Sequence, residues 1–245
     1  MKRPIFLSSF IFISFCAISC ISSKQTAIID VTTGLIAYYP FEGNANDISG
    51  NNQNASEQGN YTYVNGVRGK AIRIIGENTS YHVNGGYVRL PMIDTTNLKA
   101  FTICMWVQED TMITGGEAYI YFGTDCDIGW CGLGHFDVHY NYSVGSNNAI
   151  NYPLVLPFDS SVVGKWTFYS LVYGNKYFSV YVNSNLIGGL KQKLFIYGNN
   201  ATIGSRAWGG RYRGYSSRMV GEIDEVRLYN RALSVEEIRA LYQNK

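Results

Sequence analysis

The C-terminal stretch Gly221–Ser234 reads GEIDEVRLYNRALS and sets the fold class of this chain. Its side chains alternate, as expected for a strand in which every second residue points to the same face. The expected faces are Ile223, Glu225, Arg227 and Tyr229 on one side and Asp224, Val226 and Leu228 on the other. β-Branched and aromatic residues suit such a half-buried surface. The stretch therefore predicts a strand close to the C-terminus.

A short helix is predicted directly after this strand. Ser234 and Glu237 have the spacing of a capping box, in which each side chain accepts a hydrogen bond from the backbone amide of the other residue. Apolar residues then recur at helical spacing, namely Val235, Ile238, Leu241 and Tyr242. We expect the chain to end as a strand, a short link and an amphipathic helix.

The closing stretch resembles the last strand of laminin-G-like, concanavalin A-like jelly-roll domains, whose usual ending is similar to GxIDDVRIYNRALSxxEI. Glu225 stands where that ending has its second Asp. The segment Gly34–Asn51, GLIAYYPFEGNANDISGN, is similar to the family's opening GLVAYYPFxGNAxDxSGN. The resemblance at both ends implies an all-β, antiparallel two-sheet jelly-roll β-sandwich over residues 34–245, with a short C-terminal helix.

The composition suits one β-sandwich domain. The chain has 245 residues, of which 16% are charged and 15% aromatic, so it can bury a large core and is not a disordered sequence. Removing Lys2 and Arg3 with the leader leaves 18 basic residues against 18 acidic ones. A formally neutral chain without a basic stripe argues against a nucleic-acid partner.

The middle of the chain reads as many short strands without helices between them, which predicts antiparallel sandwich topology. The expected strands are 34–41, 70–75, 87–90, 101–108, 119–123, 136–142, 165–173, 177–183 and 201–204. Segments 42–59 and 143–159 are expected to be irregular. Residues 174–176, Gly-Asn-Lys, predict a tight hairpin turn. Trp106 is expected in the core.

Residues 1–19 have the form of an export signal. A positive start, Met1–Arg3, precedes an apolar run that is shorter than the about 20 residues of a transmembrane helix. Ala17–Cys20 resembles a bacterial lipobox, although Leu is commoner at the first position. We therefore expect a lipid on Cys20, a polar tether over residues 20–33 and a bacterial outer-membrane location held by the lipid anchor alone. An ordinary signal peptide cleaved near the same place is the alternative.

Three cysteines follow the leader. Cys126 and Cys131 bound a short loop, and an oxidising destination favours a disulfide between them. Their spacing does not resemble that of a zinc site. Cys104 lies in an apolar strand and is expected to be a buried free thiol.

No catalytic residues are predicted. The segment Glu222–Glu225 superficially resembles the start of the ExDxxE motif of jelly-roll β-glucanases, which need two carboxylates about 5 Å apart for retention. Val226 and Arg227 stand where the third acid would fall. We therefore expect a protein that is not an enzyme, and glycoside hydrolysis is the least favoured alternative.

The resemblance also implies a structural calcium ion. Asp47 and Asp224 match family positions rich in acids, and a backbone carbonyl near Gly76 completes the ligand set by analogy with jelly-roll glucanases. Calcium prefers such oxygen ligands. The alternatives are that Asp47 caps its own turn and that Asp224 pairs with a neighbouring arginine.

Aromatic and basic residues gather in two expected loops and suggest a ligand site. They are Trp130 between the cysteines, and Trp208, Arg211, Tyr212 and Tyr215 within 205–218. Aromatic platforms beside hydrogen-bond donors suit the apolar faces and hydroxyl rims of sugars. The alternative is that Trp208 folds back onto the sandwich and the arginines are simply solvated.

Together these features predict an exported, lipid-anchored domain with a non-catalytic recognition role and a glycan as the leading ligand. The choice of ligand rests on the resemblance, because a fold alone does not fix a function. The alternative partner is a surface protein, bound in an adhesive or structural role. That alternative predicts an exposed apolar patch of several hundred Å².

Overall fold

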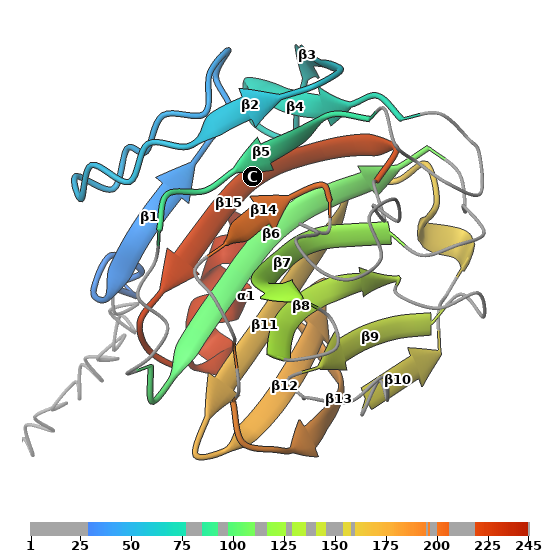
Figure 1. The fold of residues 1–245 in the computed structure, drawn as a ribbon. Coiled ribbons are helices and arrows are strands. Elements are labelled where there is room, and N and C mark those ends of the chain that lie inside the picture. The colour runs from blue at the N-terminus through green and yellow to red at the C-terminus, as the bar shows by residue number, and fades with distance from the viewer. Residues whose placement is uncertain are drawn as a thin grey trace, which may run out of the picture.

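The structure is a computed structural model that describes residues 29–76, 85–92, 98–110, 117–125, 129–135, 141–145, 154–157, 160–194, 196, 200–205 and 219–244. These residues form two antiparallel sheets and one C-terminal helix (Figure 1). The predicted fold class, an all-β sandwich with a short C-terminal helix, is confirmed. Among the described residues, no helix is both long and apolar enough to span a membrane.

Eight strands of the described chain form sheet A. Seven of them follow one another in space as β13 (Asn185–Lys191), β12 (Tyr177–Val182), β11 (Thr167–Gly174), β6 (Phe101–Glu109), β15 (Gly221–Tyr229), β4 (Lys70–Ile74) and β3 (Tyr61–Asn65). The eighth, β1 (Leu35–Tyr39), also pairs with β15. One edge of β15 is therefore shared by β4 and β1.

Seven described strands form sheet B. Their spatial order is β10 (Leu154–Pro157), β9 (Asn141–Gly145), β8 (Gly129–His135), β7 (Glu117–Asp125), β14 (Ala201–Ile203), β5 (Tyr87–Arg89) and β2 (Ser56–Gln58). A short 3-10 helix, Ser160–Val162, precedes β11, and the helix α1, Val235–Gln243, follows β15.

The central strand β15 defines two ends of the sandwich. Its last residue, Tyr229, pairs with Leu35 at the start of β1, and we term this the entry end. Its first residue, Gly221, pairs with Ile74 and Glu109, the last residues of β4 and β6, and we term this the far end. Residues 219–220, directly before β15, therefore lie at the opposite end of the sandwich from residues 29–34, directly before β1.

Two hydrophobic clusters hold these elements together. The larger fills the space between the sheets and includes Ile103 and Met105 of β6. The alternate residues Cys104 and Trp106 face the outer side of sheet A, where they pack in a second cluster with α1. The Trp106 ring stacks on Tyr242 of the helix, with centroids 5.5 Å apart. Trp106 is thus buried as predicted, but beneath the helix rather than between the sheets.

The predicted closing strand and capping box are confirmed. The backbone amide of Glu237 donates to the Ser234 hydroxyl oxygen at 3.2 Å, and the amide of Ser234 donates to the Glu237 carboxylate at 2.7 Å. These bonds satisfy two amides that the first helical turn leaves without intrahelical partners. Helix α1 then buries Ile238 and Leu241 against sheet A.

The strict alternation expected along β15 is wrong. The pairing with β6 shifts register between Asp224 and Arg227, and Glu225 has a φ of 54°. This is a β-bulge, in which one extra residue lets the strand change which face it presents. Val226 consequently joins the core between the sheets, whereas Tyr229 joins the outer cluster.

The middle of the chain holds strands that the sequence did not predict. Strand β8 covers 129–135, which the sequence did not predict; of the expected strand 136–142, residues 141–142 belong to β9 and residues 136–140 lie outside the described part. Strand β10 lies inside the expected link 143–159, and β2 lies inside the expected loop 42–59. Strand β13 was missed because its sequence, NLIGGLK, alternates poorly and contains two glycines.

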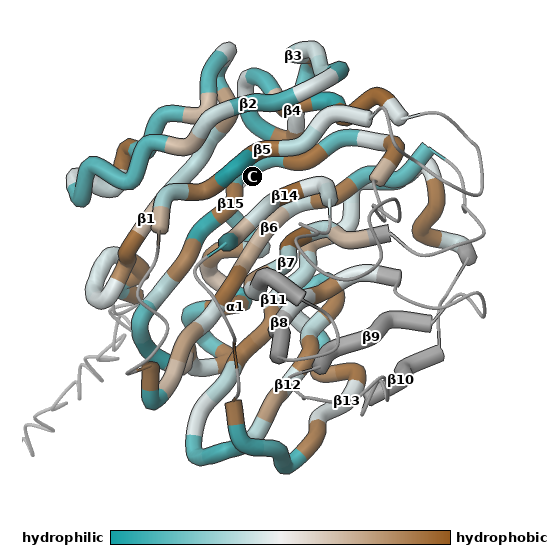
Figure 2. The backbone as a smooth tube through the Cα atoms, viewed as in Figure 1, coloured by the Kyte–Doolittle hydropathy of each residue, from teal (hydrophilic) through white to brown (hydrophobic). Residues whose placement is uncertain are grey.

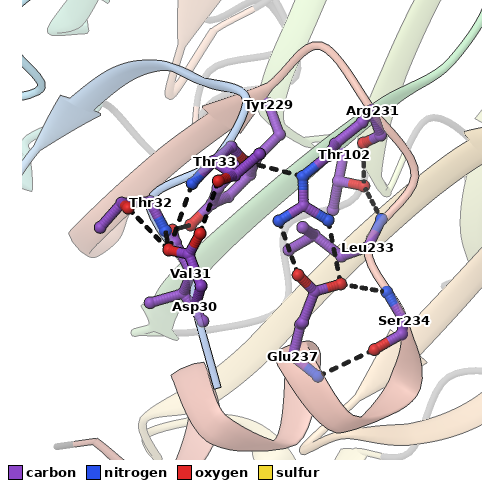
Figure 3. A network of polar contacts seen from close by, with 10 residues as sticks. All are labelled: Asp30, Val31, Thr32, Thr33, Thr102, Tyr229, Arg231, Leu233, Ser234 and Glu237. Carbon is purple, nitrogen blue, oxygen red and sulfur yellow. Dashed lines mark hydrogen bonds and ion pairs between the residues drawn. The ribbon is translucent and has the colours of Figure 1, made fainter. Parts of the chain in front are cut away.

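Residues 29–33, which we term the entry strap, contact the domain although the sequence placed them in the tether (Figure 3). The Tyr229 hydroxyl donates to the carbonyl oxygen of Val31 at 2.9 Å, and Nε of Arg231 donates to that of Thr33 at 2.7 Å. The Arg231 guanidinium also makes two hydrogen bonds to the Glu237 carboxylate, at 2.6 and 3.0 Å. One side chain therefore joins the strap, the end of β15 and α1.

Candidate functional site

The bulge in β15 places the carboxylate of Asp224 in a buried position. The side chain is fully buried, on the outer face of sheet A opposite Trp106. Its Oδ2 accepts a hydrogen bond from the backbone amide of Arg68 at 3.1 Å, whereas its Oδ1 has no hydrogen-bond partner. A Cβ at Gly66 would lie 2.5 Å from Oδ2, so only glycine fits there. The carboxylate is thus enclosed with one oxygen unsatisfied.

Burial sets the protonation of this carboxyl group. It raises the pKa of Asp224 to about 7, although backbone amides such as that of Arg68 act in the opposite direction. The adjacent Glu225 carboxylate raises the pKa further. Asp224 is therefore a group that either holds a proton near neutral pH or needs a positive charge nearby.

Glu225 forms the centre of a charged cluster beside Asp224. Its carboxylate accepts a hydrogen bond from the Tyr38 hydroxyl and one from Nη2 of Arg227, both at 2.7 Å. The Arg227 guanidinium lies over the Tyr38 ring, with Cζ 3.8 Å from the centroid. Arg68 is a more distant ion-pair partner of Glu225, at 3.8 Å. The arginines thus pair with Glu225, and none reaches the free oxygen of Asp224.

Asp47 has a structural role in the Asn-rich loop. Its Oδ1 accepts from the backbone amides of Tyr38 and Ser49 at 2.9 and 2.8 Å, and its Oδ2 accepts from the Ser49 hydroxyl and the Gln53 amide at 2.8 and 3.0 Å. Partial burial raises its pKa, but the hydrogen bonds outweigh this effect and hold the pKa below its ordinary value. This geometry favours the alternative in which Asp47 organises its own turn.

The three predicted calcium ligands do not converge. Gly76 lies beyond the far end of β4, roughly 15 Å along that strand from the position beside Asp224, at about 3.3 Å per residue. Both oxygens of Asp47 are already occupied. Within the described ranges, no group of three His, Cys, Asp or Glu residues could hold a metal ion. Asp224 alone keeps a free oxygen, so calcium at this residue stays a prediction without a complete ligand set.

Glu222 and Asp224 share the outer face of sheet A but do not form a hydrolytic pair. Glu222 is bound to Arg73 at 2.8 Å, and Arg73 also pairs with Asp110. Asp224 is fully buried. A hydrolytic pair needs two carboxylates that both reach the substrate. Neither of these two does so in the observed arrangement.

The predicted ligand residues lie largely outside the described part. Trp208, Arg211, Tyr212 and Tyr215 fall in segment 206–218, and Trp130 lies in β8, where its side chain is not described. The residues flanking the segment are at the far end, where the amide of Met219 donates to the Gly204 carbonyl at 2.9 Å.

Trp130, in contrast, belongs to the opposite end of sheet B. Strand β7 starts at the far end, where the Tyr119 hydroxyl donates to Glu109, and it runs to Asp125, which pairs with Gly129 of β8. Trp130 therefore lies towards the entry end. Trp130 and the residues that flank segment 206–218 therefore lie towards opposite ends of the sandwich.

The cysteine predictions are resolved only in part. Cys104 is a buried free thiol, as predicted, and burial raises its pKa to about 12. Cys20 and Cys126 lie outside the described residues, and Cys131 pairs with Phe122 in the β7–β8 ladder without a described side chain. The lipid on Cys20 and the disulfide between Cys126 and Cys131 stay predictions.

Several residues of this region were not found by sequence reasoning. Tyr38, Arg68 and Arg227 surround the bulge, but in sequence each reads as an ordinary strand or loop residue. Gly66 lies in the turn between β3 and β4, where the pair Asn65-Gly66 is a turn signal, and its close approach to Asp224 is not visible in the sequence.

Solved structures of similar fold include two kinds of binding domain. Domain 4 of AbnA, a GH43 extracellular arabinanase from Geobacillus stearothermophilus, was solved in complex with arabinotriose; it is 22% identical with a TM-score of 0.67, over 85% of this chain and 98% of that chain. The binding domain of botulinum neurotoxin DC was solved in complexes with rat synaptotagmin II and with SialylT; both match at 14% identity and TM-score 0.66. The match covers 87% of this chain but only 52% of the toxin chain.

These similarities establish the fold alone, because the identities are low. No curated protein matches the sequence. The sequence does match the family model of the concanavalin A-like lectin/glucanases superfamily over residues 82–239, which is more than half of the chain. The two-sheet architecture agrees with that match. The chain therefore belongs to the concanavalin A-like lectin/glucanase superfamily.

Proposed function

We propose that this protein is a surface lipoprotein whose domain binds carbohydrate without cleaving it. The observation that carries the proposal is the match to domain 4 of the arabinanase, because it covers 98% of a domain solved with arabinotriose bound. That match concerns a whole domain of the same architecture rather than a fragment of a larger one. A bound sugar in such a domain supports a glycan as the ligand class of this chain.

The proposed site is segment 206–218, whose described flanking residues, Gly204 and Met219, lie at the far end of the sandwich. Trp208, Arg211, Tyr212 and Tyr215 offer stacking surfaces and hydrogen-bond donors of the kind that bind sugars. Trp130 is not part of this site, because its strand position is towards the entry end. The non-catalytic role is supported by the burial of Asp224 and by the ion pair that holds Glu222.

A glycan array tests the ligand class, and a pair of tryptophan variants tests the site. The chain from Ile21 onward, which keeps every described residue, is applied to the array and then to a column of the retained polysaccharide. We expect Trp208→Ala to abolish retention and Trp130→Ala, the matched control at the other end, to leave it unchanged. Normal retention of the Trp208 variant would reject the site, and an empty array would reject the ligand class.

The lipid anchor at Cys20 is part of the same proposal. Its support is the small residue Ser19 directly before Cys20 and the apolar run upstream. Cells grown with a radioactive fatty acid should label the wild-type chain but not a Cys20→Ala variant. Label in the variant would show that Cys20 is not the lipidated residue.

A second candidate function is binding of a protein partner. The edge strand β13 exposes Leu186 by 61% and Ile187 by 36%, and Tyr177 on the neighbouring strand is 45% exposed. Exposed apolar residues on an edge strand are a common basis of protein association. Leu186→Lys would weaken such binding and leave retention on a glycan column unchanged.

A further inference from the structure

Four lysines lie at the entry end of sheet A, and we term them the entry lysines: Lys99, Lys176, Lys191 and Lys193. All four are exposed. They come from three separate segments of the chain, namely the lead into β6, the β11–β12 turn and the end of β13. Figure 2 shows these hairpin ends as a hydrophilic lower edge of the molecule. The fold brings these lysines together, because they are not consecutive in the sequence.

Strand pairing places these segments together. Lys191 is opposite Tyr177 in the β12–β13 ladder, and the amide of Gln192 donates to the Lys176 carbonyl at 2.8 Å. Lys99 is two residues before Phe101, which begins β6 and pairs with the end of β11. The three segments therefore lie at the neighbouring ends of β6, β11, β12 and β13, on one side of the entry end.

The entry lysines have no anionic partner in the described part of the chain. None of them takes part in an ion pair or a side-chain hydrogen bond there. Among the described residues, the acids at this end are Asp30 of the strap, Glu236 and Glu237 of α1, and Asp125 at the end of β7 in sheet B. Glu237 is bound to Arg231, and Asp30 accepts hydrogen bonds from the threonines of the strap. Asp30, Glu236 and Glu237 belong to the β1–β15 side and Asp125 belongs to sheet B, so none of them lies on the lysine side of sheet A.

The chain enters the domain beside this surface. Arg231 and Tyr229 hold the strap at the entry end, and a Cβ at Gly174 in the β11–β12 turn would lie 3.1 Å from Ala232. The path from Cys20 to Ile29 is nine residues, which reach at most about 30 Å when fully extended. A lipid on Cys20 would keep the entry lysines within that reach of a bilayer.

We propose that the entry lysines dock the domain on an anionic phospholipid surface, so that the far end points away from the membrane. This inference rests on the proposed lipid anchor for its biological setting. Each lysine brought to an anionic bilayer strengthens binding about fivefold. Tyr177 is 45% exposed beside Lys191, and its amphipathic ring suits the headgroup region. The residues that flank the proposed glycan-binding segment, at the far end, would then face outward.

Vesicle sedimentation tests the docking surface without the anchor. The chain from Ile21 onward is mixed at low salt with vesicles of phosphatidylcholine alone or of phosphatidylcholine with phosphatidylglycerol. We expect binding to the anionic vesicles only, with loss of binding at high salt because charges near a surface are screened. A Lys176→Glu/Lys191→Glu variant should bind at least tenfold more weakly.

The matched control is a Lys165→Glu/Arg89→Glu variant of equal net charge, in which Arg89 belongs to β5 of sheet B. Both residues are exposed, and Lys165 adjoins Gly164, whose amide donates to the Glu109 carbonyl at the far end. The control should bind within twofold of the wild type. Equal losses in both variants, or no binding to anionic vesicles, would overturn the proposal. Retention of the wild type on acidic polysaccharide but not on anionic vesicles would overturn it in favour of a glycan partner.

Failure of the docking surface is distinguishable from failure of the anchor. The vesicle assay uses a chain without Cys20, so its result does not depend on lipidation. Fatty-acid labelling at Cys20 with no vesicle binding would leave the anchor standing and remove the docking surface. An environment-sensitive dye at Asn175→Cys, in the entry-end turn, should respond to anionic vesicles, whereas the same dye at Ser184→Cys, in the far-end turn, should not.

Discussion

Replacing Asp224 by asparagine is the sharpest test of the buried bulge. The change keeps the size of the side chain and removes its charge. In the folded wild type, burial raises the pKa of this carboxyl group from 3.8 to about 7. Because the pKa is higher in the folded state, the folded protein binds the proton more tightly than the unfolded chain. The contribution of this group to the free energy of unfolding is therefore complete below pH 4 and is lost as the pH rises through 7. The wild type should therefore become less stable over this pH range. The variant should not show this loss, because asparagine does not titrate.

The magnitude follows from the size of the shift. A change of about 3 pKa units corresponds to about 4 kcal/mol of unfolding free energy. The new amide leaves a buried NH2 at the position of Oδ1, which has no partner, and this costs about 1–3 kcal/mol at every pH. The expected signature is therefore a difference in stability, variant minus wild type, that increases by about 4 kcal/mol between pH 4 and pH 8.

Urea denaturation of both proteins in EDTA measures this difference, because other titrating groups cancel between them. A difference that stays constant from pH 4 to pH 8 would refute the reasoning. Calcium provides a second measurement at pH 8. If Asp224 binds the ion, calcium should raise the melting temperature of the wild type and not that of the variant. No effect of excess calcium on the wild type would remove the calcium prediction.

Three further substitutions probe other contacts. Gly66→Ala should cost about 1–3 kcal/mol in urea denaturation, because its Cβ would lie 2.5 Å from Asp224; an unchanged midpoint would contradict the close packing. Asp47→Ala should cost about 2 kcal/mol at pH 7 and less as the pH falls below 4, because the lowered pKa of Asp47 makes its contribution fade on acidification; a pH-independent loss would argue against a charged acceptor. Arg231→Ala should lower the free energy of unfolding by about 1–2 kcal/mol and speed proteolysis within the entry strap. It should also raise the pKa of Glu237, which Arg231 lowers in the wild type, and an NMR titration would show this change.

Much of the fold followed from two motifs at the ends of the chain. The closing stretch gave the strand, the capping box and the helix correctly, because periodicity and capping are local properties. The bulge was missed because an extra residue with positive φ leaves no mark in an alternating pattern, and Glu225 is not a residue that favours this conformation.

The site could be predicted less well than the fold. Asp224 and Asp47 were selected as a pair on family resemblance, but their environments differ, since one carboxylate is saturated by four hydrogen bonds and the other keeps a free oxygen. Which amides reach a carboxylate depends on how loops pack, and spacing in the sequence does not encode it. Sequence likewise suggested one aromatic set of Trp130 and Trp208, whereas strand order places Trp130 and the residues that flank segment 206–218 at opposite ends.

The division of one edge of β15 between β1 and β4 has a consequence for how the molecule is made. β15 pairs with three other strands, namely β1, β4 and β6. Its pairing with β1 joins residues that are far apart in the sequence, such as Leu35 and Tyr229. A chain that emerges N-terminus first therefore holds β1, β4 and β6 with exposed edges until its last residues arrive. Such non-local pairing is slow, and exposed edges invite association with other chains. Residues 221–229 therefore complete sheet A, and a chain truncated before Gly221 would lack the strand that joins β1, β4 and β6.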